Sequence, residues 1–141
     1  MGYKFLEDIA IADVAFEAGG KDLKELFESA ALATFEVMVD TKKVKHKIKR
    51  KIVLDNEDLN GLLYDFLSEL VYLKDTYGLV FSKFNVNIKE NKIYKLKAEV
   101  VGDKIDYKKQ ELRSDVKAVT LYRFKVEKVR NKYKAMIVLD I

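Results

Sequence analysis

Two amphipathic helical repeats, separated by strand-like runs, constrain the fold of this chain more than any other feature. Apolar residues recur with helical spacing over residues 22–39 and again from residue 59 to Gly78. Asp22 precedes the first repeat, and the acidic run 55–58 precedes the second, so both helices have N-terminal capping residues. Gly78 provides a C-terminal stop. The apolar positions are Leu23, Leu26, Phe27, Ala30, Ala31, Thr34 and Met38, then Leu59, Leu62, Leu63, Phe66, Leu67, Leu70 and Leu73. Each helix therefore needs another element to cover its apolar stripe.

The rest of the chain is dominated by segments typical of strands. The expected strands are residues 3–18, with a break near Glu7 and Asp8, then 44–54, a hairpin over 79–102 that turns at Glu90-Asn91, and finally 115–128 and 132–141, joined at Arg130-Asn131. Residues 103–114 are polar and are expected to form a loop. The sequence predicts an α+β fold in which two amphipathic helices pack on a largely antiparallel sheet, within a single layered domain spanning residues 1–141.

Composition excludes several classes of function. The 141 residues include no Cys, which rules out disulfides, zinc-thiolate sites and a cysteine nucleophile. His46 is the only histidine, and no phosphate-binding glycine loop or nucleophile elbow is present, so a stand-alone hydrolase has the least support. No signal peptide or membrane-length apolar run is found, so we expect a cytoplasmic protein without a membrane partner. A net charge of +4 is too mild for a protein that mainly coats nucleic acid.

The last residues suggest a pair of fixed carboxylates. The strand-forming run 135–139 leads directly into Asp140 and Ile141. Chain ends are usually poorly ordered unless a sheet holds them, so this ending is expected to be held in place. The Asp140 side chain and the α-carboxylate of Ile141 would then lie about one residue apart along an extended backbone, roughly 3.5 Å. Two fixed carboxylates favour a bound cation.

Asp13 is a candidate third member of this site. It is the only charged residue within the apolar run 9–16, where a carboxylate is costly unless it is paired or metal-bound. Alternatively, Asp13 lies on the solvent side of a strand or accepts turn hydrogen bonds, and composition alone favours that interpretation. A site built from oxygen ligands suits a hard divalent cation, Ca²⁺ or Mg²⁺, with Mn²⁺ as a further option, rather than a softer metal.

A second candidate surface is a row of alternating lysines. The row consists of Lys43, Lys45, Lys47, Lys49 and Lys51, which would project from one face of a strand over 44–54. Such lysines can protect an edge strand from aggregation, or they can contact phosphates, with Lys45, Lys47 and Lys49 as the candidates. The interleaved positions carry no aromatic residue for base stacking, which favours the first interpretation. A small basic-surface RNA-binding module, without any ligase-activating role, remains the alternative function.

Three stretches of the chain together resemble the archease family. The first is Ala12-Asp13 followed by the helix sequence of residues 23–33; the second is residues 62–70 continuing into Gly78-Leu79-Val80-Phe81. The third combines Val116-Lys117-Ala118-Val119-Thr120 with the Asp140-Ile141 ending. These stretches span nearly the whole chain in the family's order.

The resemblance implies a function and a set of site residues. It implies an accessory protein, not an enzyme, which promotes the GTP-dependent guanylylation and multiple turnover of an RtcB-type tRNA-splicing ligase, an archaeal RNA-processing role. Its partner would be that ligase, with RNA contacted only through it. The implied metal ligands are Asp13, Asp140 and Ile141, and Lys117, in the family motif, is a further candidate for a partner contact or another functional contact.

Two positions depart from the family pattern. The family usually reads His-Thr-Ala-Asp at the first site, where this chain has Ala10-Ile11-Ala12-Asp13. After Lys-Ala-Val-Thr the family often continues Tyr-His, where this chain has Leu121-Tyr122. Both changes keep the carboxylates and remove side chains that would hydrogen bond around them.

Overall fold

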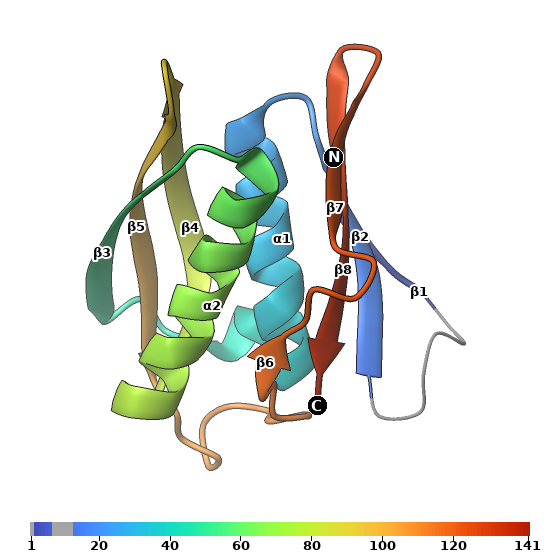
Figure 1. Ribbon diagram of the computed structural model, residues 1–141. Coiled ribbons are helices and arrows are strands. Elements are labelled where there is room, and N and C mark those ends of the chain that lie inside the picture. Colours follow the sequence, from blue (N-terminus) through green and yellow to red (C-terminus); the bar gives the residue numbers. More distant parts are fainter. Residues whose placement is uncertain (1, 7–12) are drawn as a thin grey trace.

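The fold is a three-layer arrangement in which two helices lie between two antiparallel sheets (Figure 1). The computed structural model describes residues 2–6 and 13–141. One sheet has the order β1-β2-β8-β6, with β7 also paired to β8, and the other has the order β3-β5-β4. The bounds of the elements are β1 Tyr3–Leu6, β2 Asp13–Gly20, α1 Leu23–Met38, a 3-10 turn Thr41–Lys43, β3 Ile48–Asn56, α2 Leu59–Tyr77, β4 Leu79–Glu90, β5 Tyr94–Lys104, β6 Ala118–Val119, β7 Lys125–Val129 and β8 Lys132–Asp140. The predicted α+β class is confirmed, with two sheets enclosing the helices in place of the single sheet expected.

Both helices begin, and α2 also ends, where the local sequence dictates. The Asp22 carboxylate accepts a hydrogen bond from the Glu25 backbone N–H at 2.9 Å, and Asp58 accepts one from the Gly61 N–H at 3.1 Å. Gly78 ends α2 in the left-handed conformation, with φ of 64°, which glycine adopts without steric cost. The predicted helices over 22–39 and from 59 to Gly78 are therefore confirmed.

Small residues let α1 lie close to both sheets. Ala30, Ala31 and Ala33 are fully buried, and Phe35 packs edge-on against Phe81 of β4 with 5.6 Å between ring centroids. Phe27 connects the helices, because its ring lies 5.9 Å from that of Phe66 in α2. A helix buried on nearly all sides has little room for larger side chains, which explains the alanine-rich sequence of α1.

The predicted strand over 44–54 is wrong at its beginning. Asp40 accepts a hydrogen bond from the Lys42 N–H at 3.1 Å and starts the 3-10 turn that contains Lys43. Lys45 then lies in the connection to β3, and Lys47 makes one backbone bond to Gly102 just before the strand. Of the five lysines in the proposed row, only Lys49 and Lys51 belong to β3. The row is therefore not a single strand face.

The predicted strand over 115–128 is also wrong, because two short strands replace it. Ala118–Val119 pairs with Asp140 and Leu139, whereas Lys125–Val129 pairs with Met136 to Lys132. These two pairings are out of register along β8, and a turn over 121–124, with Arg123 at φ of 53°, takes up the extra residues. The hairpin predicted at Arg130-Asn131 is confirmed, with Val129 opposite Lys132. The predicted break near Glu7 and Asp8 lies outside the described residues.

Gly102 allows β4 and β5 to approach each other where β4 has a register irregularity between Phe81 and Lys83. A Cβ atom on Gly102 would collide with the backbone of Val80 and Phe81, and backbone atoms cannot move aside cheaply. We expect Gly102→Ala to lower the free energy of unfolding by about 1–3 kcal/mol, the usual cost of overpacking. Urea denaturation of the variant and the wild type measures this change in the free energy of unfolding. Gly19→Ala is the matched control, since its nearest neighbour, the Tyr133 carbonyl oxygen, is 3.8 Å away, so a similar loss there would contradict the explanation.

Candidate carboxylate site at the end of the β2–β8 pair

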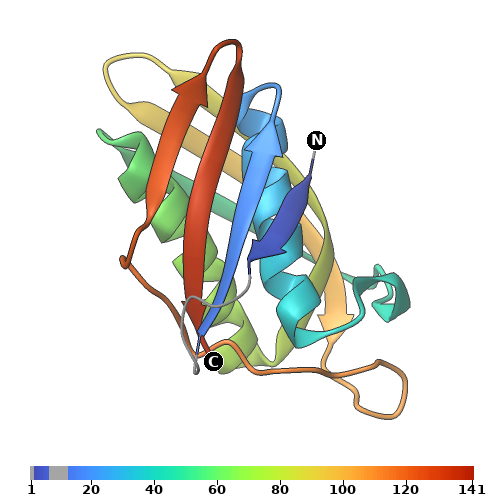
Figure 2. The same cartoon turned by 90° about the vertical axis from the view of Figure 1, so that its right-hand side faces the viewer.

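Asp13 and Asp140 are directly opposite each other across the antiparallel β2–β8 pair. Asp13 is the first residue of β2 and Asp140 the last of β8, so both lie at one end of the sheet, where the chain also ends (Figure 2). Both side chains are partly exposed. By strand alternation they share the face of Glu17 and Met136, away from the helices. Asp13 therefore lies on the solvent side of its strand, as the alternative interpretation predicted. It also lies opposite Asp140, as a shared carboxylate site requires.

This opposition of two carboxylates is unfavourable in isolation. Like charges directly opposite in an antiparallel pair destabilise the sheet, because their Cα atoms are only about 4.5–5.5 Å apart. Within the described part of the chain, neither Asp13 nor Asp140 lies within ion-pair distance of a Lys or Arg side chain. Among the described residues the two carboxylates therefore have no cationic partner, which fits a donor set for a hard cation.

The Lys-Ala-Val-Thr stretch lies on the other side of Asp140. The Lys117 N–H donates to the Asp140 carbonyl oxygen at 2.8 Å, and both the N–H and the hydroxyl of Thr120 donate to the Val138 carbonyl oxygen, at 3.0 and 2.9 Å. Val119 is buried between these contacts, whereas the Lys117 side chain is exposed. The structure therefore brings together three of the predicted site residues, Asp13, Asp140 and Lys117, with Ile141 next in sequence.

The candidate ligands do not by themselves complete a metal site. Across residues 2–6 and 13–141, no three side chains of His, Cys, Asp or Glu lie close enough together to hold a metal ion. A cation bound by Asp13 and Asp140 needs further oxygen donors, for which the α-carboxylate of Ile141 and water are the candidates. The family positions at Ala10, Ile11 and Ala12 lie outside the described residues, while Leu121 and Tyr122 are exposed beyond the stretch.

Sequence reasoning missed a buried lysine that anchors this stretch to α2. Lys74 is only 5% exposed, and its Nζ atom donates to Asp115 Oδ1 at 2.5 Å and to the Val116 carbonyl oxygen at 2.8 Å. Its Nζ also lies 2.6 Å from Asp75 Oδ1. The signal was present in the sequence, since Lys74 follows Leu67 and Leu70 at the spacing of the buried stripe.

The pKa of Lys74 reflects two opposing effects. Burial alone lowers the pKa of an ammonium group, but hydrogen bonds and charge from Asp115 and Asp75 outweigh burial and raise the pKa above its usual 10.5. Lys74 therefore stays charged at neutral pH and holds residues 115–116 at the end of α2, directly before Lys117.

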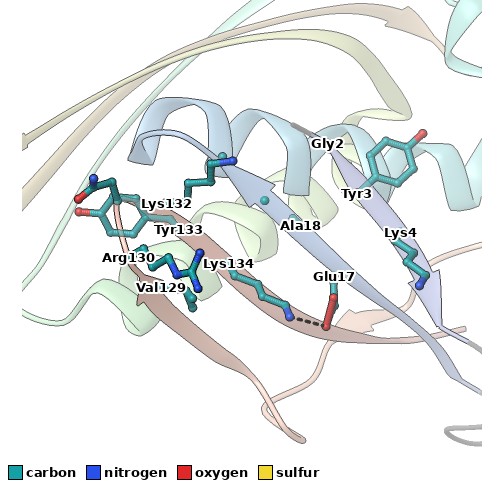
Figure 3. A pocket seen from close by; sticks show the side chains of 13 residues that line it. Gly2, Tyr3, Lys4, Glu17, Ala18, Val129, Arg130, Lys132, Tyr133 and Lys134 are labelled. Carbon is teal, nitrogen blue, oxygen red and sulfur yellow. Dashed lines mark ion pairs between the residues drawn. The ribbon is translucent and has the colours of Figure 1, made fainter.

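A hollow at the opposite end of the same sheet is separate from the carboxylates. It lies between β1, the Gly19-Gly20 end of β2 and the β7–β8 hairpin, as Figure 3 shows. Lys4, Arg130 and Lys132 line it, and Lys134 there pairs with Glu17 at 3.3 Å. The candidate phosphate contacts Lys45, Lys47 and Lys49 are elsewhere, in and before β3 of the second sheet.

None of the helices in the described part of the chain is long and apolar enough to cross a membrane.

Comparison with known proteins decides the family. The model of the archease protein family matches residues 3–141. This chain belongs to the archease family. It is 42% identical to a protein archease of Methanosarcina barkeri over 141 residues, covering 99% of this chain and 95% of that one. It is 43% identical to the protein archease of Pyrococcus abyssi over 132 residues, covering 92% and 93%.

Solved structures agree with the archease fold. The solution structure of Methanobacterium thermoautotrophicum protein 1598 is similar with a TM-score of 0.87 and 39% identity, covering 99% of both chains. A Thermotoga maritima crystal structure, described as an archease and possible chaperone, has a TM-score of 0.64 at 20% identity and covers 92% of this archease and 91% of that chain. The second likeness supports the fold alone. The predicted family resemblance is therefore confirmed.

Proposed function

We propose that this archease is an accessory protein that activates an RtcB-type tRNA-splicing ligase, promoting its GTP-dependent guanylylation and multiple turnover. Membership of the archease family supports an accessory role of this kind. The observation that carries the proposal is the direct opposition of Asp13 and Asp140, two carboxylates without a cationic partner among the described residues.

The proposed site holds one hard divalent cation, Ca²⁺, Mg²⁺ or Mn²⁺. Asp13 and Asp140 provide side-chain oxygens from neighbouring strands, and the α-carboxylate of Ile141 provides a third donor. Oxygen donors of this kind bind such cations with positions left for water or for substrate phosphates. A bound cation would supply positive charge that can be shared with nucleotide phosphate oxygens of the ligase.

The chain's own residues position this site. The β2–β8 register fixes the spacing of Asp13 and Asp140, and the Lys117 N–H bond to Asp140 closes the other edge of β8. The Lys117 side chain is exposed next to this end of β8 in the backbone pairing, and we propose that it contacts an acidic or phosphate group of the docked ligase.

The activity test is RNA ligation by the cognate ligase with RNA in excess over enzyme. We expect the ligase alone to slow after about one turnover and to continue when this protein is added, with faster incorporation of guanylate. Equal product with and without the protein would overturn the proposal.

A separate prediction concerns the α-carboxylate. Adding one glycine after Ile141 moves this group by one residue, about 3.3–3.6 Å of chain. We expect weaker cation binding and weaker ligase stimulation, measured by calorimetry and by the ligation assay. Replacing Ile141 with Val, which keeps the carboxylate in place, is the matched control. Unchanged binding by the extended chain would remove the terminus from the ligand set and leave the aspartates.

A further inference from the structure

The outer face of the β3–β5–β4 sheet carries far more basic than acidic side chains. Its inner face packs on the helices, so its outer face is at the surface of the molecule (Figure 1, left). Strand register arranges the outward residues in four cross-strand rows: Lys49, Val101 and Lys83; Lys51, Glu99 and Asn85; Val53, Lys97 and Asn87; and Asp55, Lys95 and Lys89. We call these the lysine face. Six lysines are opposed there by two acids, of which Glu99 lies 3.9 Å from the Lys49 Nζ atom.

Protection of sheet edges does not explain this arrangement. Lysines on edge strands discourage pairing with other chains, and β3 and β4 are edge strands. Lys95 and Lys97, however, are exposed residues of β5, the central strand, which already has a partner on each side. Lys95 lies directly opposite Lys89 on β4 as well as Asp55 on β3, and the like charges of Lys95 and Lys89 in that position destabilise a sheet. A cross-strand lysine pair on a central strand is better explained by an anionic ligand.

The side chains between the lysines indicate which anion. No aromatic residue points outward from these three strands, so unpaired bases have nothing on which to stack. Val53, at 70% exposure, is the one strongly exposed apolar side chain of the lysine face, too little for a membrane or for the apolar centre of a protein interface. Asn85 and Asn87 add exposed amides, which commonly contact phosphate and sugar oxygens; the Asn85 oxygen already accepts a hydrogen bond from Lys24 Nζ at 2.5 Å, so its NH₂ group is the part open to a ligand.

We infer that the lysine face binds the phosphate backbone of double-stranded RNA segments. Paired RNA is recognised mainly through its shape, phosphates and 2′-hydroxyls, a mode that a broad lysine surface without stacking residues can use. This contact is direct and does not rest on ligase activation. The proposed binding residues are thus those that the strand register places on the lysine face, and not the row of alternating lysines predicted from the sequence.

The test is equilibrium binding of the protein alone to an RNA duplex over roughly 50–200 mM salt. We compare the wild type with a variant carrying Lys89→Gln, Lys95→Gln and Lys97→Gln. Each lost phosphate contact should reduce the slope of log affinity against log salt by about one, so the variant's slope should be shallower by about three. Its affinity should fall similarly for duplexes of different sequence.

The matched control removes three positive charges elsewhere. Lys4→Gln, Arg130→Gln and Lys132→Gln change the hollow on the other sheet (Figure 3) and lower the formal net charge of +4 by the same amount. We expect this variant to keep wild-type affinity and slope. Equal losses in both variants, or no salt-sensitive binding by the wild type, would overturn the inference. So would tighter binding to phosphatidylserine vesicles than to the duplex.

Folding is checked by thermal denaturation. The three glutamine substitutions are at exposed positions, and the lost Lys89–Lys95 repulsion and the lost Lys95–Asp55 attraction should offset each other, so the melting temperature should stay close to that of the wild type. Should the triple variant melt earlier, Lys97→Glu alone provides the same comparison with a single charge reversal. Wild-type affinity in a folded Lys97→Glu variant would likewise contradict RNA binding at this face.

Discussion

Replacing Asp140 with asparagine is expected to abolish binding of divalent cations, measured by isothermal titration calorimetry with Ca²⁺, Mg²⁺ and Mn²⁺. The neutral amide keeps the size of the side chain and removes one of the two opposed charges. Asp13→Asn should have the same effect, because each carboxylate is expected to bind the ion only with the other. Asp55→Asn is the matched control, since Asp55 is exposed on the other sheet and the substitution changes net charge equally.

The same variants should show opposite effects on stability with and without the ion. Without a cation, Asp140→Asn relieves like-charge repulsion and should stabilise the fold by about 0.2–1 kcal/mol. With a cation at about a hundred times its dissociation constant, only the wild type and the Asp55→Asn control should gain about 2.7 kcal/mol. Thermal denaturation in chelator and in excess cation measures both. A variant that gains as much as the wild type would show that the ion binds elsewhere.

Replacing Lys74 with methionine is expected to lower the stability of the fold substantially. Methionine fills the buried path of the side chain but leaves the Val116 carbonyl oxygen without its donor and Asp115 without its partner. The expected loss is about 1–3 kcal/mol in the free energy of unfolding, the cost of an unsatisfied buried polar group. Lys92→Met, at an exposed turn position, is the control and should be neutral.

Hydrogen exchange and pH separate this anchoring role from simple packing. In Lys74→Met, the amides of Lys117 and Thr120 should exchange faster relative to those of β2, because the segment they belong to loses its attachment to α2. The pKa of Lys74 is raised on folding, so its contribution is fully present below pH 10.5 and is lost as pH rises through the folded pKa. The stability difference between wild type and variant should therefore shrink above pH 10.5. A constant difference would contradict the charged hydrogen bonds as its source.

Local sequence signals predicted the helices and both hairpins well, the one that turns after Glu90 and the one at Arg130-Asn131. Caps at Asp22, Asp58 and Gly78 act within one turn of the residues they bond, so they can be read without knowing the fold. The Arg130-Asn131 turn is similarly local. The strand over 115–128 was not predictable in this way, because its interruption depends on how β6 and β7 pair with β8.

The candidate sites show the same division between local and non-local information. The predicted row of lysines on one strand face is wrong, because the prediction continued the strand pattern of alternating side chains through the 3-10 turn that Asp40 begins. The lysine face depends on register among β3, β4 and β5, which no single segment encodes. Asp13 and Asp140 were grouped from chemistry and family resemblance, but that they are directly opposite is a property of the β2–β8 pairing.

We propose that Asp13 and Asp140 activate the ligase together through a bound cation. The most direct test of this claim is the number of RNA molecules joined per ligase when wild type, Asp13→Asn, Asp140→Asn or the Asp55→Asn control is added at saturating concentration. We predict many turnovers with the wild type and the control, and about one with either site variant. Full stimulation by folded Asp13→Asn and Asp140→Asn proteins would contradict the claim.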